Sequence, residues 1–184
     1  MRTGTLNKVF TVEEYIQHEW HASARSEFIN GQLFEMPGEK DINNEIAGNL
    51  YILLSTLLKS FGYFVYAHDV KVKIFGENKY YYPDVFVTKE AKTAINQYIK
   101  SEPVLIVEVV SETSQVNDYV DKYIDYKKIP SLQYYLIVEP ETLLISCYTR
   151  REQSEWITSK FTRQEDEVRL DILGISFNVM DVYQ

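Results

Sequence analysis

Apolar residues recur with the helical period in three parts of the chain. The predicted helices are Val12–Trp20, a segment that runs from Asn43 or Asn44 to Leu58, and a segment from about Asn117 to Lys128. Thr11 and Glu14 form a capping-box pattern before the first helix. An asparagine is expected to cap the second helix, and Gly62 follows its end.

The remaining apolar runs are short, rich in Val, Ile, Tyr and Phe, and bounded by turn residues, as is typical of strands. Asn30–Gly31 lies between two such runs and predicts a hairpin over Arg25–Met36. Lys89–Lys100 is expected to be partly helical and exposed. The other predicted strands are Tyr63–Asp69, Val70–Phe75, Tyr80–Thr88 with Pro83–Asp84 in its middle, Pro103–Val110, Gln133–Val138, the hairpin partners Leu143–Tyr148 and Glu155–Phe161, and one or two strands in Val168–Val179.

Length and charge narrow the class of protein. With 184 residues, the chain is expected to form one mixed α/β domain, residues 1–184. It carries 19 Lys+Arg against 27 Asp+Glu, a net charge of −8, which argues against a protein that coats nucleic acid through many phosphate contacts. The single cysteine, Cys147, cannot form an internal disulfide and fits a small core position. There is no signal-peptide pattern and no apolar run of membrane-spanning length, so a cytoplasmic protein without membrane association is expected.

One acidic residue interrupts the apolar run Pro103–Val110, which is typical of a strand buried on both faces. This residue, Glu108, must be paired, protonated or bound to a metal ion, because an isolated buried charge is too costly. In the helix that follows, Asp118, Lys122 and Tyr126 recur every four residues and share one face. A short polar link returns that face to the end of the strand, so these residues form a candidate site.

Two further carboxylates lie within predicted strands. Glu27 is in the first hairpin, and Asp84 follows Pro83, whose missing N–H could direct Asp84 out of the sheet. If Asp84 and Glu108 lie on neighbouring strands, they could share one Mg²⁺ or Mn²⁺ ion. Such an ion lowers the pKa of a bound water, and a nearby lysine could orient that water.

Each of these residues also has an ordinary structural explanation. A single acid in a strand is more often a structural group than a metal ligand, and Asp118 with Lys122 has the spacing of a helix-surface ion pair. The other residues that could take part in a site are expected at structural or solvent-exposed positions. They are His18, His21 and His68, which lack metal-ligand spacing, Lys71 and Lys73 on a solvated strand face, and Arg150 and Arg151 at a hairpin tip.

Several separate motifs, in this order, resemble the Uma2 family of restriction-endonuclease-like proteins. The motifs are the Glu-x-x-x-Gly-x-Leu hairpin of residues 27–33, Pro83-Asp84, Glu108-Val109-Val110-Ser111, the helical Asp118, Lys122 and Tyr126, and the strand of residues 133–138. The resemblance extends from about Thr11 to Glu139. It implies an α/β fold with a restriction-endonuclease-like PD-(D/E)xK core, in which helices flank a central mixed sheet with extra β-hairpins.

The resemblance also implies roles for individual residues. Asp84 and Glu108 correspond to the two acids that hold the metal ion, Mg²⁺ or Mn²⁺, and Glu27 to an upstream acid that completes its shell directly or through water. A standard motif has its lysine two residues after the second acid, where this chain has Val110. The family commonly carries this lysine on the following helix, where Lys122 would position the nucleophilic water.

Four residues are expected to support this site. Ser111 and Asp118 lie beside the acids, and Tyr126 would pack or form a hydrogen bond behind Lys122. Many family members have a histidine at the start of the second helix, where this chain has Asn43. Asparagine can cap a helix or form hydrogen bonds, but it cannot transfer a proton at neutral pH.

Two hypotheses of different classes follow. The first is a Mg²⁺-dependent DNA endonuclease, which would form a homodimer if it cuts both strands of a duplex. The second is a catalytically silent module that binds protein or nucleic acid. The net charge of −8, Val110 and Asn43 favour the second hypothesis, whereas Asp84, Glu108 and Lys122 favour the first. A hydrolase of a small phosphorylated substrate would differ from the nuclease in pocket shape.

Overall fold

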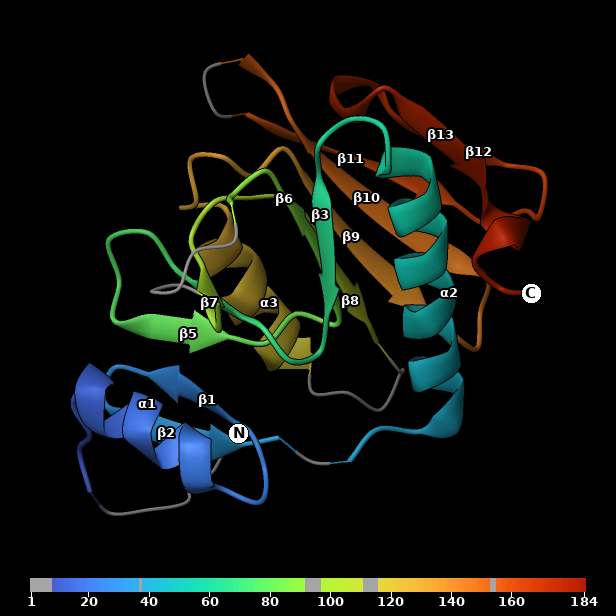
Figure 1. The fold of residues 1–184 in the computed structure, drawn as a ribbon. Coiled ribbons are helices and arrows are strands. Elements are labelled where there is room, and N and C mark those ends of the chain that lie inside the picture. The colour runs from blue at the N-terminus through green and yellow to red at the C-terminus, as the bar shows by residue number, and fades with distance from the viewer. Residues whose placement is uncertain (1–7, 37, 92–96, 111–115, 153–154) are drawn as a thin grey trace.

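The computed structural model describes residues 8–36, 38–91, 97–110, 116–152 and 155–184, with the side chains of residues 116–119 outside this description. A six-stranded mixed sheet lies between two helices, α2 (Asp41–Leu58) and α3 (Val116–Tyr126) (Figure 1). The predicted α/β class with a mixed sheet flanked by helices is therefore confirmed. No helix in these ranges is long and apolar enough to cross a membrane.

Besides the six-stranded sheet, α2 and α3, the described residues form two further sheets and three short helices. The six-stranded sheet has the order β11 (Trp156–Phe161), β10 (Leu144–Arg150), β9 (Tyr134–Glu139), β8 (Pro103–Val109), β6 (Val85–Thr88) and β3 (Phe64–Ala67). The five-stranded sheet has the order β2 (Gln32–Glu35), β1 (Ser26–Ile29), β5 (Lys79–Tyr81), β4 (Lys71–Lys73) and β7 (Ile99–Lys100). The other elements are α1 (Val12–His21), the pair β12 (Glu167–Leu170) and β13 (Ile175–Asn178), and the 3₁₀ helices η2 (Asp171–Leu173) and η3 (Val179–Asp181).

Strand β8 lies at the centre of the large sheet, antiparallel to β6 and parallel to β9. Leu105, Val107 and Val109 join the core beneath α2, whereas Ile106 joins the core beneath α3. The predicted burial of this strand on both faces is confirmed. Because side chains alternate along a strand, Glu108 lies on the α3 face with Ile106.

The N-terminal part attaches to this core through the smaller sheet. The predicted capping box at the start of α1 is present. Tyr15 of α1 stacks on Phe28 of β1 at a ring-centroid distance of 4.9 Å, and Phe28 contacts Tyr80 of β5 edge-on at 5.9 Å. Since β1 pairs with β5, the hairpin that carries Glu27 is joined to the segment that leads into Asp84.

The predicted single strand Tyr80–Thr88 is wrong, because it is two strands in different sheets. β5 ends at Tyr81 in the five-stranded sheet, and β6 begins at Val85 in the six-stranded sheet. Pro83 lies between them and has no N–H to donate to a strand ladder. The chain therefore passes from one sheet to the other at Pro83–Asp84, which places Asp84 at their junction.

The predicted start of the second helix is also wrong. Helix α2 begins at Asp41 with Lys40 at its N-cap position, so Asn43 lies inside the first turn and is not the cap. The buried face of this helix continues to its first turn, and Asn43 is only 7% exposed. A polar side chain on this face needs a partner within the protein, and Asn43 Nδ2 has one in Glu39 Oε2.

Two lysines expected at the surface are buried. Lys71 is 7% exposed, and its ammonium lies 3.6 Å from Glu19 Oε2 and over the ring of Tyr82. Lys100 is fully buried and donates to the carbonyl oxygen of Ala91. The expected exposed helix over Lys89–Lys100 is therefore wrong at its end, which is strand β7, while residues 92–96 lie outside the described ranges.

A buried carboxylate fixes α3 against the smaller sheet. Asp125 is 2% exposed and accepts hydrogen bonds from Lys79 Nζ at 2.7 Å, Tyr81 OH at 2.7 Å and Lys128 Nζ at 2.9 Å. Burial raises the pKa of Asp125, but these three donors outweigh it and the pKa is lowered. Helix α3 is therefore fixed in rotation, so that Lys122, about one turn earlier, also faces the sheets.

Asp125→Ala is expected to lower the free energy of unfolding by about 2–3 kcal/mol, because Lys79 and Tyr81 lose a buried acceptor. Urea denaturation at neutral pH measures this loss. Asp121→Ala, an exposed acid on the same helix, is the matched control and should change stability by less than about 0.5 kcal/mol. Equal effects of the two substitutions would contradict the role assigned to Asp125.

Candidate functional site

Asp84 and Glu108 face each other across two neighbouring strands. The antiparallel register pairs Val85 with Val107, so continuing it by one residue places Asp84 opposite Glu108. The backbone N–H of Val109 donates to Asp84 Oδ2 at 2.7 Å, which fixes this carboxylate at the end of β6. Two acids that are far apart in the sequence therefore meet at one edge of the central sheet.

Glu108 is held from the helix that covers its face. It is 3% exposed, and its Oε1 accepts hydrogen bonds from Tyr126 OH at 2.7 Å and from Lys122 Nζ at 3.2 Å. Lys122 and Tyr126 are one helical turn apart on α3, so a single face of the helix supplies both donors. The predicted return of this face to the end of the strand is confirmed.

Lys122 also connects this strand to the N-terminal hairpin. Its ammonium lies 2.9 Å from Glu27 Oε1, and both side chains are at most 10% exposed. The alternative that placed Lys122 on the helix surface is therefore wrong, whereas the Asp118 side chain of that predicted ion pair lies outside the described part of the chain. The structure brings four of the predicted residues together: Glu27, Glu108, Lys122 and Tyr126, with Asp84 directly opposite Glu108.

The site contains more negative than positive charge, with three carboxylates and one ammonium. Burial raises the pKa of Asp84 well above its usual range, and the negative charge of Glu108 raises it further. Burial also raises the pKa of Glu108, although the nearby Lys122 opposes this shift. A positive charge beside the two acids would therefore stabilise their ionised forms.

The lysine at this site is a cation and not a proton acceptor. Burial by itself would lower the pKa of Lys122, but the charges of Glu108 and Glu27 outweigh it and raise the pKa above its usual value. Lys122 therefore stays protonated at neutral pH. It can donate hydrogen bonds and stabilise negative charge, but it cannot take a proton from water.

Glu39 lines the same cavity as Asp84 and is hydrogen-bonded to a second polar residue, Asn43. Asn43 of α2 donates from Nδ2 to Glu39 Oε2 at 2.8 Å, and the charge of Glu39 contributes to the raised pKa of Asp84. Asn43 Oδ1 is buried and has no hydrogen-bond partner in the described part of the chain. Sequence reasoning missed Glu39, because it lies in a connecting segment without any motif.

The structure describes one of three further residues near the predicted site, Val110, and leaves the side chains of the other two undescribed. Val110, which replaces the motif lysine, is 9% exposed, and its N–H donates to the carbonyl oxygen of Val138. Asp118 lies on α3, but its side chain is outside the described part, as is the whole of Ser111. The supporting roles predicted for these two residues therefore stay predictions.

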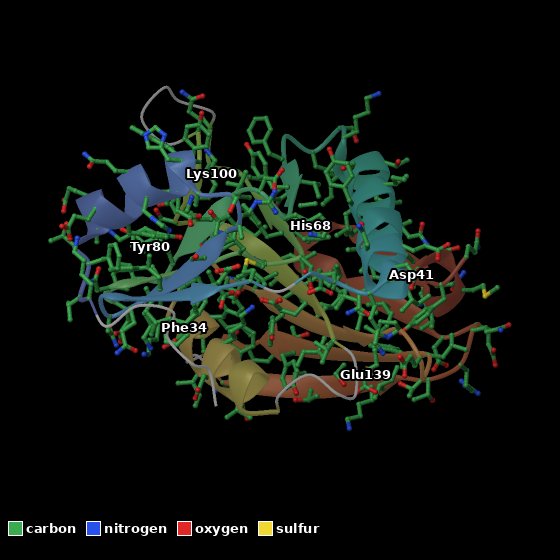
Figure 2. All side chains as sticks on the ribbon, turned by 90° about the horizontal axis from the view of Figure 1, so that it is seen from below. Phe34, Asp41, His68, Tyr80, Lys100 and Glu139 are labelled. Atoms are coloured by element: carbon green, nitrogen blue, oxygen red, sulfur yellow. The ribbon has the colours of Figure 1, made fainter. Side chains whose placement is uncertain are left out.

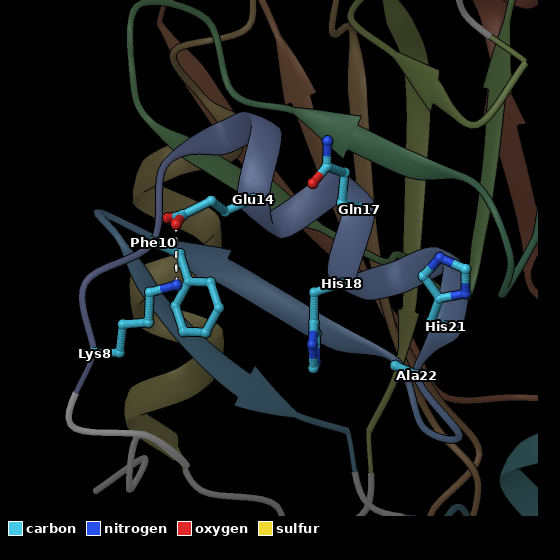
Figure 3. Close-up of a pocket in the computed structure, with 7 residues that line it drawn as sticks. All are labelled: Lys8, Phe10, Glu14, Gln17, His18, His21 and Ala22. Carbon is cyan, nitrogen blue, oxygen red and sulfur yellow. Dashed lines mark hydrogen bonds and ion pairs between the residues drawn. The ribbon is translucent and has the colours of Figure 1, made fainter.

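His68 lies apart from His18 and His21, which line one cavity. His18 and His21 line a shallow cavity of about 440 Å³ on the outer side of α1, and their rings do not face each other (Figure 3). His68 lies in the turn between β3 and β4 and lines a different cavity, which contains Asp84. Within the described ranges, no group of three or more His, Cys, Asp or Glu side chains is already arranged as a metal site.

Comparison with known proteins gives a consistent set of relatives. A profile of the Uma2 family, described as "Putative restriction endonuclease", matches residues 12–180. The uncharacterized protein sll1609 of Synechocystis is 29% identical over 95% of this chain and 100% of its own length. The uncharacterized protein slr1290 of the same organism is 28% identical over 94% of this chain and 90% of its own length.

A solved structure has the same fold. The crystal structure of a "putative nuclease belonging to DUF820" from Anabaena variabilis matches with a TM-score of 0.77 over 95% of this chain and 97% of that chain. The two sequences are only 13% identical, so this likeness concerns the fold.

Asp84→Asn is expected to stabilise the protein at neutral pH. Because folding raises the pKa of Asp84, stability falls as the pH rises from the unfolded-state pKa through the folded-state pKa. Removing the charge should raise the free energy of unfolding by about 0.5–2 kcal/mol at neutral pH. The gain should disappear below the ordinary aspartate pKa, where both proteins are neutral at this position. Urea denaturation across the pH range measures both effects.

Asp121→Asn is the matched control for this prediction. This exposed residue undergoes the same chemical change on α3 and should alter stability by less than about 0.5 kcal/mol at any pH. A loss of stability for Asp84→Asn at neutral pH would show that its charge is compensated in the folded protein and would refute the proposed excess of negative charge.

Proposed function

The chain belongs to the Uma2 family, and from its geometry we propose that it is a metal-dependent DNA endonuclease. One observation supports this proposal most strongly: Asp84 lies opposite Glu108 on adjacent strands, and Lys122 reaches Glu108 from the next helix. Two acids and a cation at one sheet edge are the groups that phosphodiester hydrolysis requires. A duplex cut on both strands would need two such centres, as a two-fold homodimer provides.

The residues present fit a divalent metal ion. With all side chains ionised, Glu27, Asp84 and Glu108 exceed Lys122 by two negative charges, which one Mg²⁺ or Mn²⁺ would balance. Asp84 and Glu108 would hold this ion through carboxylate oxygens, the ligands that Mg²⁺ prefers, and Glu27 would complete the shell through water. When bound, the ion supplies a water of lowered pKa and balances charge on the phosphate.

The chain's own residues then orient the reactants. Lys122, held between Glu27 and Glu108, donates hydrogen bonds to the attacking water and to the phosphate oxygen that gains negative charge. Tyr126 keeps Glu108 in place by donating to its Oε1. Attack in line with the leaving oxygen gives a hydrolysed phosphodiester, and Ser111 and Asp118 keep the supporting roles predicted from the sequence.

A second candidate function is a silent binding module. The ion pairs of Lys122 with Glu27 and Glu108 give the lysine a structural role, since a buried carboxylate needs a partner whether or not the protein is an enzyme. Substitution of Lys122 therefore tests folding as well as catalysis. A substitution that stabilises the fold and removes activity separates these roles.

Asp84→Asn provides this test. It keeps an oxygen that accepts from the N–H of Val109 and removes a charged metal ligand, so cleavage of DNA in Mg²⁺ should fall by at least about 100-fold while the fold becomes more stable. Gel electrophoresis of plasmid and single-stranded DNA measures the cleavage. Asp121→Asn should cleave like the unmodified protein. Unchanged cleavage by Asp84→Asn would remove Asp84 from the mechanism.

Metal binding can be measured without knowing the DNA substrate. Calorimetric titration with Mn²⁺ should give one saturable site in the unmodified protein and none in Glu108→Gln. Glu167→Gln, at an exposed acid of β12 that pairs with Arg169, is the control and should keep the site. Equal Mn²⁺ binding by the unmodified protein and Glu108→Gln would remove Glu108 as a ligand and favour the silent module.

A further inference from the structure

A cavity of about 640 Å³ lies against Asp84, a size within the range of small-molecule sites. Its walls come from the end of α1 and the residues after it, the segment between β2 and α2, the first turn of α2, the turn between β3 and β4, and the link between β5 and β6. The polar or charged lining residues that matter here are Glu19, Arg25, Glu39, His68, Asp69 and Asp84.

The side wall of this cavity is fixed by buried hydrogen bonds. Glu19 accepts from Tyr82 OH and from the N–H of Ser26, and it lies 3.6 Å from Lys71 Nζ. Burial raises the pKa of Tyr82 above its usual value, so its hydroxyl stays a donor at neutral pH. The charge of Glu19 is therefore balanced by Lys71, and its hydrogen bonds fix this wall of the cavity.

The turn opposite this wall is held beside Asp84. His68 has a left-handed backbone with φ +57°, and its N–H donates to the carbonyl oxygen of Asp84 at 3.2 Å. Seen from below, His68 lies between the N-terminal hairpin and α2, whose first residue Asp41 is also labelled (Figure 2). A non-glycine residue in this conformation beside a candidate site indicates that the turn is held by the structure around it.

The carboxylates that line this cavity outnumber its Lys and Arg side chains. Asp69 is paired with Arg25. Neither Glu39 nor Asp84 has an ion-pair partner in the described ranges, although Glu39 accepts one hydrogen bond from Asn43 Nδ2. A phosphate group without an intervening metal ion would be repelled by these carboxylates. A group rich in N–H donors would satisfy them.

We propose that this cavity binds an unpaired nucleobase with an exocyclic amino group, next to the phosphodiester that the protein cleaves. The amino groups of cytosine and adenine donate to carboxylate and amide oxygens, whereas thymine offers acceptors at the corresponding position. A base inside a stacked duplex cannot enter a cavity, so the substrate is single-stranded DNA or DNA with an extruded nucleotide.

The charge of the whole chain supports this substrate class. A net charge of −8 gives little affinity for a duplex through phosphate contacts, so affinity must come from another source. A base-binding cavity provides it, because hydrogen bonds to a base edge are separate from contacts to the phosphates. The proposal rests on the proposed nuclease function for the reaction, but base binding is separable from cleavage.

Fluorescence anisotropy tests the proposal with labelled oligonucleotides in EDTA, where no metal-dependent cleavage occurs. Single-stranded oligo-dC and oligo-dA should bind at least about tenfold more tightly than oligo-dT or a duplex of the same length. Ala24 lines the cavity in a segment without regular structure, and Ala24→Trp should fill the space and lower oligo-dC affinity about tenfold. Ser60→Trp, in an exposed turn after α2, is the control and should bind like the unmodified protein.

Glu39→Gln tests whether the hydrogen-bonding capacity of residue 39 selects the base, because the substitution leaves the size of the side chain nearly unchanged. An amide both donates and accepts, so the preference for oligo-dC over oligo-dT should fall while oligo-dT binding rises. A merely steric role of Glu39 would leave this ratio unchanged and would overturn the proposal. Loss of Mn²⁺ binding without any change in oligonucleotide binding would also overturn it, because the cavity would then hold a hydrated cation.

Binding and cleavage together separate the two proposals. Oligo-dC binding that Ala24→Trp removes, without cleavage in Mg²⁺, supports the cavity and refutes the nuclease. Cleavage of duplex and single strand at equal rates, unchanged in Ala24→Trp, supports the nuclease and refutes the cavity. Absence of binding to every oligonucleotide refutes the cavity proposal as well.

Discussion

The buried contact of Lys122 with Glu27 and Glu108 is the interaction on which the arrangement of this protein depends. It joins α3, the N-terminal hairpin and the central strand at a single ammonium. Taking one partner away leaves a buried charge uncompensated, a cost that usually exceeds what the pair itself contributes. The relative positions of these three elements are therefore set by charge as well as by apolar burial.

Helix α3 carries two such contacts with opposite balances of charge. At Asp125, one carboxylate is shared by Lys79 and Lys128, and the pKa of the acid is lowered. At Lys122, one ammonium faces several carboxylates, and the pKa of Asp84 is raised. The contact at Asp125 stabilises the position of the helix. The contact at Lys122 leaves negative charge on the carboxylates that the described side chains do not balance. One part of α3 therefore serves stability, and the preceding turn serves the candidate site.

The sequence allowed much of the fold and the pairing of acids to be predicted, because both depend on local patterns. The hairpin at Asn30–Gly31 and the buried strand around Glu108 follow from turn chemistry and periodicity. The resemblance to the Uma2 family pointed to Lys122, which contacts Glu108 in the structure. The burial of Lys71 could not be predicted, because its partner Glu19 is distant in the sequence and only the folded chain brings them together. Pro83 was a local sign that the strand could be interrupted, but the sequence pattern did not show that β5 and β6 belong to two different sheets.

The junction at Pro83 explains why the acids and the cavity occur together. Asp84 ends the link between the two sheets, so one side of it faces Glu108 and the other belongs to the cavity wall. The N-terminal part contributes Glu27 to the first and Arg25 to the second, although these residues are only two positions apart on the chain. Changes at the cavity rim can therefore alter which substrate is held while the acids and Lys122 keep their geometry.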